Sequence, residues 1–310
     1  MERLNQTSSV SEFILLGLSS QPEDQKPLFI LFLIIYLVTI TGNLLIILAI
    51  RSDPQLHTPM YFFLSFLSFI DICFSTTIVP RMLVNFLSEK KTISYAGCLT
   101  QMYFTYALGN TDSYLLAAMA YDRYVAICDP FHYVTIMSHR PCVLLVAFSC
   151  SLPHLHSLLH ILLLNQLTFC DSNVVHHFFC DINPLLKLSC SSIFVNDLTL
   201  KTEGLVFWVT PFLCIVFSYV RILIAVLRIP SATGKRKAFS TCGSHFTVVI
   251  LFYGSIFYVY LQPLSSYTVQ DRVATLVYTV LSSMFNPFIY SLRNKDMKRG
   301  LGKLMGRRKS

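Results

Sequence analysis

Seven long apolar stretches constrain this chain more than any other feature of its sequence. A helix needs about 20 predominantly apolar residues to cross the hydrocarbon core of a bilayer. Stretches of this kind, each with at most one charged residue, lie at 28–50, 59–80, 95–121, 141–164, 204–220, 238–261 and 273–292, and the fifth continues as a helix to about Arg228. The sequence therefore predicts an all-α membrane protein, a bundle of seven transmembrane helices.

The composition excludes a soluble globular protein of this size. Among the 310 residues, 54% are apolar and 13% are charged, whereas about a quarter of the residues in a soluble domain are charged. The net charge is +8. Because no basic stripe with interleaved aromatic residues lies away from the predicted membrane, we attribute this charge to topology and contact with the lipid bilayer, and we expect no nucleic-acid partner.

The charges of the loops predict the orientation of the bundle. One side of the membrane would carry the loops after the first, third and fifth stretches and the C-terminal tail. This side holds 16 of the 24 Lys and Arg residues and 4 of the 16 acidic residues, whereas the other side holds 8 Lys and Arg residues and 10 acidic residues. Basic residues favour the cytoplasmic face, so we expect the N-terminus outside the cell membrane. The chain then divides into an extracellular tail (1–27), the bundle (28–292) with a long outer loop at about 165–197, and a basic cytoplasmic tail (293–310).

Two features suit an N-terminus on the outside. Asn5 begins the tripeptide Asn-Gln-Thr, an acceptor pattern for N-glycosylation. Four of the ten cysteines lie at or beyond the outer boundary, in the compartment where disulfides form. They are Cys98, Cys170, Cys180 and Cys190, and their spacing alone allows three different pairings.

Two carboxyl groups fall inside the predicted helices, where an ionisable residue is a functional candidate by default. Asp112 lies 11 residues before Arg123, and Asp71 lies 12 residues after Pro59. At 1.5 Å per residue, both carboxyl groups lie roughly 16–18 Å from the same end of the bundle. Two carboxylates at one depth in a medium of low dielectric constant do not both stay ionised without a cation or a bound proton. We therefore expect either a cation or proton site here or a hydrogen-bonded cluster of polar side chains.

The segment MAYDRYVAIC, residues 119–128, places Asp122 beside Arg123 at the end of the third stretch. An arginine at the edge of the hydrocarbon is costly unless it is paired, so these residues form either a plain interfacial salt bridge or part of a switch.

Three prolines, Pro153, Pro211 and Pro287, lie within other apolar stretches. A proline there leaves a backbone carbonyl without its partner and permits a kink.

Several segments together resemble the olfactory (odorant) receptors of tetrapods, which are rhodopsin-like G-protein-coupled receptors. The resemblance implies a receptor that is not an enzyme, has no cofactor and binds a small, mostly apolar volatile ligand. It also implies a heterotrimeric G protein of the stimulatory, olfactory type, which raises cyclic AMP. The matching segments are Gly42-Asn43, LHTPMYFFLS at 56–65, MAYDRYVAIC at 119–128, Ser218-Tyr219, KAFSTCGSH at 237–245 and NPFIYSLRN at 286–294.

The same resemblance implies roles for individual residues. It pairs Cys98 with Cys180, and Cys170 would then pair with Cys190. It also implies a cation site of the sodium type at Asp71 and Asp112.

The resemblance further implies that Arg123 is a latch, which Asp122 holds at rest and which a movement of the sixth helix releases. The implied activation residues are Asp122, Arg123, Tyr124, Tyr219, Asn286, Pro287 and Tyr290. The residues implied to line the entrance for the G protein are Lys235, Arg236, Lys237, Ser240 and His245.

A ligand pocket is expected in the outer half of the bundle, between the third, fifth, sixth and seventh helices. Glu203 lies about 12 Å outward from Pro211 on the fifth helix, so it faces either this pocket or water and lipid headgroups. Offsets from the motifs place these further residues at the pocket: Met102, Thr105, Tyr106, Gly109, Phe207, Tyr253, Ile256, Phe257, Tyr260 and Thr279.

Other functions are weighed against this one. His156 and His160 lie four residues apart on one helical face, which suits a soft metal ion, but no tight spacing of Cys and His ligands supports a metal site and we expect none. Two further alternatives stay open. One is a chemoreceptor of the same fold that acts outside olfaction on a non-volatile ligand, and the more remote one is a channel or transporter.

Overall fold

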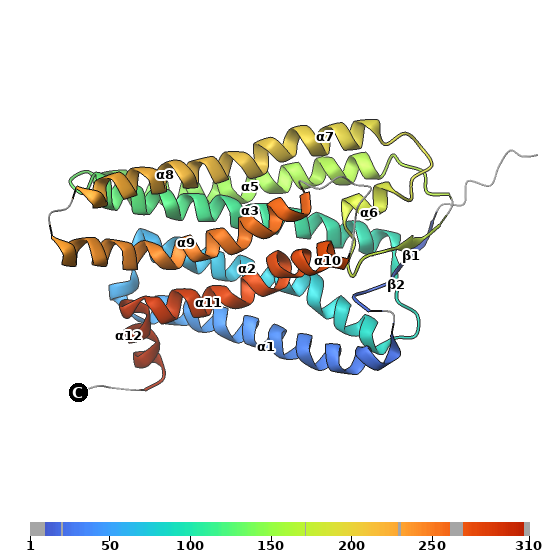
Figure 1. Ribbon diagram of the computed structural model, residues 1–310, viewed down its shortest axis with the longest axis horizontal. Coiled ribbons are helices and arrows are strands. Elements are labelled where there is room, and N and C mark those ends of the chain that lie inside the picture. The colour runs from blue at the N-terminus through green and yellow to red at the C-terminus, as the bar shows by residue number, and fades with distance from the viewer. Residues whose placement is uncertain (1–9, 20, 171, 229–230, 261–268, 307–310) are drawn as a thin grey trace, which may run out of the picture.

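The computed structural model describes residues 10–19, 21–170, 172–228, 231–260 and 269–306. Within these ranges the side chains of 205, 232–241, 244, 259–260, 269–271 and 291–293 are not described. Long helices run side by side along one axis, and helices far apart in the sequence are neighbours (Figure 1). The helices α1 (Pro22–Ser52) and α2 (Pro59–Leu87) pack against each other, and α2 packs against α3 (Tyr95–Cys128).

The other spans complete the bundle around α3. The fourth span is α5 (His139–Leu164), which packs along α3, and the sixth is α9 (Ala232–Tyr260). The fifth and seventh spans are each built from three consecutive segments. These are α7 (Phe194–Gly204), η2 (Leu205–Val209) and α8 (Thr210–Leu227), and then α10 (Val269–Leu276), η4 (Val277–Leu281) and α11 (Ser282–Arg293).

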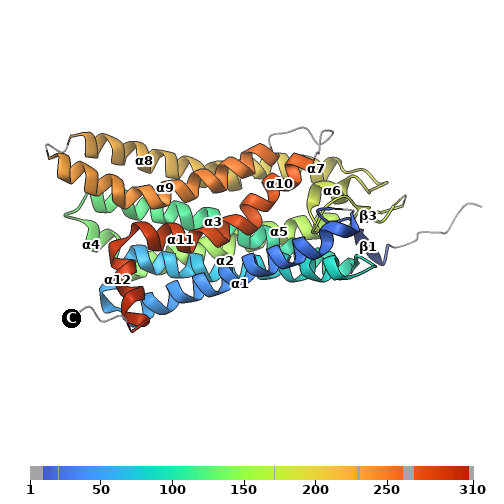
Figure 2. The same cartoon turned by 60° about the horizontal axis from the view of Figure 1, so that its bottom comes forward.

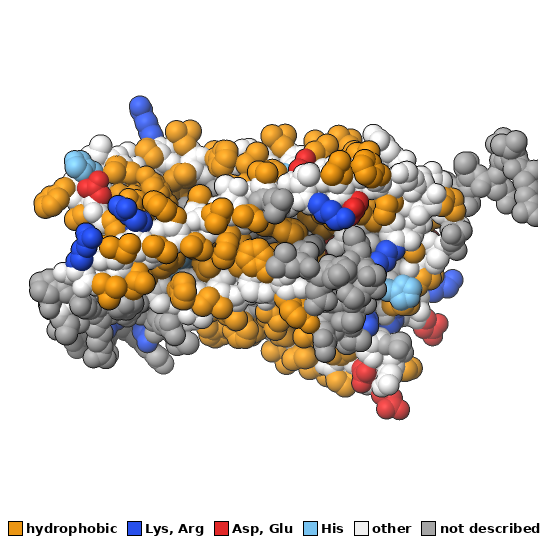
Figure 3. Space-filling view, turned by 45° about the horizontal axis from the view of Figure 1, so that its top comes forward, with side chains coloured by type: hydrophobic (Ala, Val, Ile, Leu, Met, Phe, Trp, Pro, Cys, Tyr) orange, Lys and Arg blue, Asp and Glu red, His pale blue; other side chains and the backbone are white. Residues whose placement is uncertain are grey.

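The outer surface of the bundle is apolar. Ile30, Ile34 and Leu37 of α1 are each more than half exposed, and hydrophobic side chains cover the middle of the face seen in Figure 3, whereas charged side chains gather toward the two ends. A soluble monomer rarely exposes an apolar area of this extent. Five helical segments among the described residues are long and apolar enough to cross a membrane.

The helix α3 is less apolar because it occupies the middle of the bundle. Its central residues Asn110, Thr111, Asp112 and Ser113 are all buried, at most 4% exposed. Lipid offers no partner to such groups, so polar side chains turn inward toward other helices. The two neighbours of α3 with the most extensive contacts are α5 and α8, with α2 close behind.

The fifth span begins earlier than the sequence predicts. Helix α7 starts at Phe194, ten residues before the apolar stretch at 204–220. Its first turns carry polar residues, including an Asp197–Lys201 ion pair four residues apart at 2.6 Å. Such pairs stabilise exposed helical turns, so a helix can continue beyond the apolar window that identified it.

Both composite spans contain a π-helical turn, η2 in the fifth and η4 in the seventh. A π-turn inserts one extra residue into the helix and often marks a functional site. Pro211 lies at the start of α8, directly after η2. Pro287 lies within α11 and contacts Gly42 of α1, where a Cβ atom would come within 3.0 Å of the proline ring.

We call the end of the bundle that carries the short strands the disulfide end. There β1 (Glu12–Leu15) pairs antiparallel with β2 (Thr92–Ser94) and parallel with β3 (Val174–Val175), which adds a three-stranded sheet to a fold predicted as all-helical. The side chains of Phe13 and Leu15 alternate inward and are fully buried. This alternation of buried and exposed side chains is the pattern of a half-buried strand. The strand has only four residues, so the pattern does not stand out in the sequence.

Two disulfides tie the long loop at this end. Cys98 of α3 bonds to Cys180, with 5.4 Å between their Cα atoms, and Cys170 bonds to Cys190, with 5.9 Å. The backbone N–H of Cys180 also donates to Oε1 of Gln101 at 3.0 Å. The loop, with its short helix α6 (Ile182–Leu186), is therefore anchored to α3 by both a covalent bond and a hydrogen bond.

We call the opposite end the Arg123 end. It carries η1 (Pro54–Leu56), α4 (Tyr133–Ile136) and α12 (Lys295–Leu304), which turns away from α11 (Figure 2). Asn294 caps α12 by accepting hydrogen bonds from the N–H groups of Asp296 and Met297. Both carboxylate oxygens of the buried Asp53 accept from Lys303 at 3.1 Å. These contacts attach α12 to the first loop.

A buried histidine of the long loop should make stability depend on pH. Burial, with a smaller contribution from the Arg272 guanidinium, lowers the pKa of His177 to about 3 from the ordinary 6.5. A base whose pKa is lowered on folding stabilises the fold above its unfolded pKa, and this stability is lost as the pH falls. Between pH 7 and pH 5 the loss should reach about 2 kcal/mol.

The measurement is the apparent midpoint of thermal unfolding of the purified chain across this pH range. His177→Gln should flatten the dependence, whereas the exposed neighbour His176 should leave it unchanged when replaced in the same way. Parallel curves for the original chain and His177→Gln would contradict the assignment.

The two disulfides should contribute unequally to stability. Cys98 and Cys180 are fully buried and lie 82 residues apart, whereas Cys170 and Cys190 are exposed and lie 20 apart. Loop-closure entropy assigns about 4.5 kcal/mol to the first bond and about 3.3 kcal/mol to the second. Cys98→Ser should therefore reduce thermal stability and surface delivery more than Cys170→Ser, and equal or reversed losses would argue against this order.

Candidate functional site

Asp122 and Arg123 form an ion pair near the C-terminal end of α3. Asp122 is fully buried, and Arg123 donates to its Oδ2 from Nε at 2.9 Å and also from Nη2. The hydroxyl of Tyr133 in α4 donates to the other oxygen, Oδ1, at 2.8 Å. Burial and the neighbouring carboxylate raise the pKa of Tyr133, which keeps its hydroxyl protonated. Tyr124, the next residue of the motif, packs against Phe217 of α8.

The implied cluster of Arg123, Tyr219 and Tyr290 is not joined by hydrogen bonds among the described residues. The hydroxyl of Tyr219 lies 2.5 Å from Nδ1 of His245 in α9, and the two rings are stacked. The hydroxyl of Tyr290 is buried and has no hydrogen-bond partner in the part of the chain that the structure describes. Arg123 and Tyr219 would therefore have to leave their present partners, Asp122 and His245, before the three side chains could form one cluster.

The two intramembrane carboxyl groups lie among other oxygen atoms. Asp71 and Asp112 are 1% and 4% exposed and interact electrostatically. Asn286 of α11 donates to Oδ2 of Asp71 at 2.8 Å. One oxygen of Asp112 and the hydroxyl of Ser75 have no hydrogen-bond partner among the described residues. Unpartnered oxygen atoms are the ligands that hard cations prefer.

A small cavity of about 30 Å³ lies between α2, α3, α9 and the two π-turns. The cavity is lined by four of the residues that the sequence analysis predicted at the ligand pocket, namely Thr105, Tyr106, Gly109 and Ile256. Tyr106 also donates to Asp181 of the long loop at 2.8 Å. The other lining residues, which sequence reasoning missed, are Phe74, Asn110, Trp208, Phe252 and Tyr278.

The missed residues had weak signals in the sequence. Asn110 directly follows the predicted Gly109, and Trp208, the single tryptophan of the chain, follows the predicted Phe207. In the structure Nε1 of Trp208 donates to Oδ1 of Asn110 at 2.7 Å. The offset from the motifs selected Phe207, whereas in the structure its neighbour Trp208, in the π-turn η2, lines the cavity.

Four of the other predicted pocket residues, Met102, Tyr253, Phe257 and Thr279, do not line the cavity. Met102 is buried in a separate apolar cluster near the disulfide end. Tyr253 and Phe257 of α9 form an aromatic group with Phe212 of α8, with ring centroids about 5 Å from Phe212. The hydroxyl of Thr279 bonds within its own helix, to the carbonyl of residue 275 at 2.7 Å.

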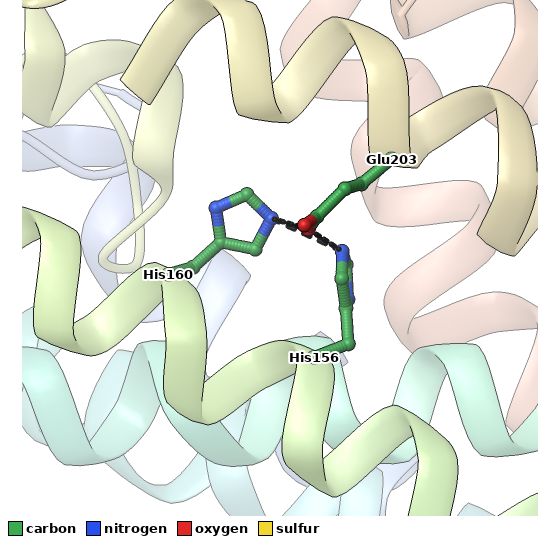
Figure 4. A group of neighbouring side chains, drawn as sticks. All are labelled: His156, His160 and Glu203. Carbon is green, nitrogen blue, oxygen red and sulfur yellow. Dashed lines mark hydrogen bonds and ion pairs between the residues drawn. The ribbon is translucent and has the colours of Figure 1, made fainter. Parts of the chain in front are cut away.

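Glu203 does not face water alone, because two histidines of α5 point toward it (Figure 4). Its Oε2 lies 3.2 Å from Nε2 of His156 and 3.6 Å from Nε2 of His160. Phe207 stacks on the ring of His156, with 3.8 Å between ring centroids. Nδ1 of His156 lies 3.3 Å from Nδ2 of Asn110. Glu203 is thus linked through polar contacts to a residue of the cavity.

Some predicted residues lie outside the part of the chain that the structure describes. Asn5 belongs to residues 1–9, and the side chains of Tyr260 and of the stretch from Lys235 to Ser240 are not described either.

Comparison with known proteins identifies the family. Residues 32–308 match the olfactory receptor family. Human olfactory receptor 1L8 is 78% identical over 308 residues, covering 99% of this chain and all of the relative. Human olfactory receptor 1L1 is 73% identical over 98% of this chain and 85% of the relative, and rat olfactory receptor 1f45 is 56% identical over 99% and 98%.

These matches span all the helices described above. They explain the seven-helix membrane bundle at the cell membrane, and they concern a family of receptors and not of enzymes. The chain belongs to the olfactory receptor family of G-protein-coupled receptors.

Proposed function

We propose that this receptor binds small, mostly apolar volatile ligands in the cavity beside Trp208 and activates a stimulatory, olfactory-type G protein that raises cyclic AMP. Family membership supports the odorant-receptor role. The location rests on the lining of the cavity, which is largely aromatic and apolar with one amide and three hydroxyls. Ligand pockets of small molecules have this composition.

The size of the cavity suggests how binding would be sensed. A volume of about 30 Å³ holds one or two water molecules, whereas ligand pockets typically measure about 300–1,000 Å³. A ligand must therefore displace side chains as it enters. Trp208 belongs to the π-turn η2 and Tyr278 to the π-turn η4, so ligand entry would press on the irregular turns of two helices at once.

The latch at the Arg123 end would transmit this movement. The Asp122 carboxylate is occupied on both oxygens, by Arg123 and by Tyr133. If the sixth helix moves outward, Arg123 can exchange its buried partner for contacts to the G protein. The single observation that carries this proposal is the three-residue arrangement at Asp122, because it holds a charge at the edge of the membrane in a form that a helix movement can release.

The orientation and the division of the chain belong to the same proposal. The excess of basic residues at the Arg123 end supports a cytoplasmic location for that end and for the tail 293–310. The tail 1–27, with Asn5 as glycosylation site, and the loop at about 165–197 would then be extracellular. The unpartnered oxygens near Asp71 and Asp112 support a sodium-type cation site in the bundle.

The first test is a cyclic AMP reporter assay of cells that express this chain, against a panel of volatiles. At matched surface expression, Arg123→Ala should reduce the maximal response at least about tenfold. Tyr133→Phe should instead raise basal cyclic AMP, because the Asp122 carboxylate loses one of its two partners and holds Arg123 less firmly.

Tyr121→Phe is the matched control for the second variant, since Tyr121 lies on the same helix end but is 40% exposed. A full response in Arg123→Ala would remove the latch from the proposal. Unchanged basal activity in Tyr133→Phe would remove Tyr133 from it.

The cavity itself is tested at Gly109. A Cβ atom there would meet Phe74 at 3.5 Å, which is an ordinary contact, so Gly109→Ala should leave an agonist's potency nearly unchanged. Gly109→Leu should fill the cavity and raise the half-maximal concentration at least about tenfold, equivalent to about 1.4 kcal/mol. Equal potencies for the two variants, at equal expression, would place the ligand elsewhere.

A further inference from the structure

Three atoms that can bind a metal ion converge between the fourth and fifth spans. They are Nε2 of His156 and Nε2 of His160 on α5 and a carboxylate oxygen of Glu203 on α7 (Figure 4). The two nitrogens lie 3.1 Å apart, and Oε2 of Glu203 lies 3.2 Å and 3.6 Å from them. The three atoms therefore form a nearly equilateral triangle.

The dimensions of this triangle suit a tetrahedral ion. Zn²⁺ binds histidine nitrogen and carboxylate oxygen at about 2.0–2.2 Å, and two ligands of a tetrahedron with bonds of this length are about 3.4 Å apart. The observed edges fall on either side of this value. An ion could thus sit just above the plane of the three atoms with only small side-chain movements.

The surroundings also favour an ion. The side chains of His156 and His160 are 4% and 1% exposed, and that of Glu203 is 27% exposed. Oε2 of Glu203 and Nδ1 of His160 are buried and accept or donate no hydrogen bond among the described residues. A carboxylate oxygen left in this state is costly, and a cation bound between the three residues would offset that cost.

We propose that His156, His160 and Glu203 form a site for a divalent transition-metal ion, with Zn²⁺ as the best-fitting ion. Two imidazoles and one carboxylate are a ligand set that first-row metals accept. The three residues leave a fourth position for water or for a ligand group. The site lies outside the proposed odorant cavity, and hydrogen bonds connect the two.

The connection runs through Asn110. Trp208 can only donate from Nε1, so Oδ1 of Asn110 faces it and the amide N–H₂ faces Nδ1 of His156. In the metal-free protein His156 therefore carries its proton on Nε2. When Nε2 binds a metal ion, the proton on the neutral ring is at Nδ1 and faces the amide nitrogen of Asn110.

This juxtaposition of two donors would be relieved if the amide of Asn110 turned over. The turn would bring the amide N–H₂ group to the indole N–H of Trp208, which would lose its acceptor and have to shift. Both Asn110 and Trp208 line the cavity. A bound ion would in this way change the polar lining that an odorant meets. Metal binding and odorant response are then coupled through one side chain.

The test is Zn²⁺ binding to the purified full-length receptor in lipid nanodiscs, by equilibrium dialysis with metal analysis. We expect one Zn²⁺ per chain, with binding weakened at least about tenfold in His160→Ala and in Glu203→Gln. His154→Ala is the matched control, because His154 is on the same helix and bonds to the carbonyl of Cys150 at 2.7 Å. It should bind Zn²⁺ as tightly as the original chain.

Co²⁺ bound to the unaltered receptor gives a second readout that does not depend on how the variants fold. Visible absorption bands of four-coordinate Co²⁺ with nitrogen and oxygen ligands would support the site. Absence of stoichiometric Zn²⁺ binding, equal affinity in all variants, or a six-coordinate Co²⁺ spectrum would each overturn it. If Zn²⁺ does not bind while cells expressing the receptor still respond to odorants, the proposed receptor function stands and the metal site fails.

Discussion

The absence of water in the bilayer is the constraint on which the rest of this structure depends. Backbone groups in hydrocarbon must bond within their own helix, which accounts for the seven long spans. Polar side chains must turn toward other helices for the same reason. The most polar span, α3, therefore lies inside the bundle, and the side chains that carry the proposed functions meet around it.

These inward polar groups lie at three levels. Arg123 and its buried partner close one end, the carboxyl groups of Asp71 and Asp112 lie near the middle, and Glu203 meets two histidines toward the disulfide end. Each of these groups contacts a partner in the present arrangement, and a movement of neighbouring helices could replace that partner with another. A receptor needs such alternatives, because a ligand shifts a conformational equilibrium only through contacts that differ between the states.

Part of the cavity lining could be predicted from the sequence, although Asn110 on α3 and Phe252 on α9 were missed. Thr105, Tyr106 and Gly109 were placed at the cavity by offsets along α3, and the structure has them there. On the fifth span the same counting selected Phe207, which stacks on a histidine, and missed Trp208, which lines the cavity. Trp208 and Phe207 both lie in the π-turn η2, and local sequence gives no clear signal for one extra residue in a turn.

The sequence by itself determined the number of membrane spans, the class of protein and the position of the Asp122–Arg123 pair, because these follow from hydrophobic length and from contiguous motifs. Tertiary structure alone decided which side chains from distant segments meet. Tyr133 reaches Asp122 across a loop, and His156 reaches Glu203 between two helices. Such contacts depend on the rotation and relative height of packed helices, which the packing of many side chains sets together and which no short segment encodes.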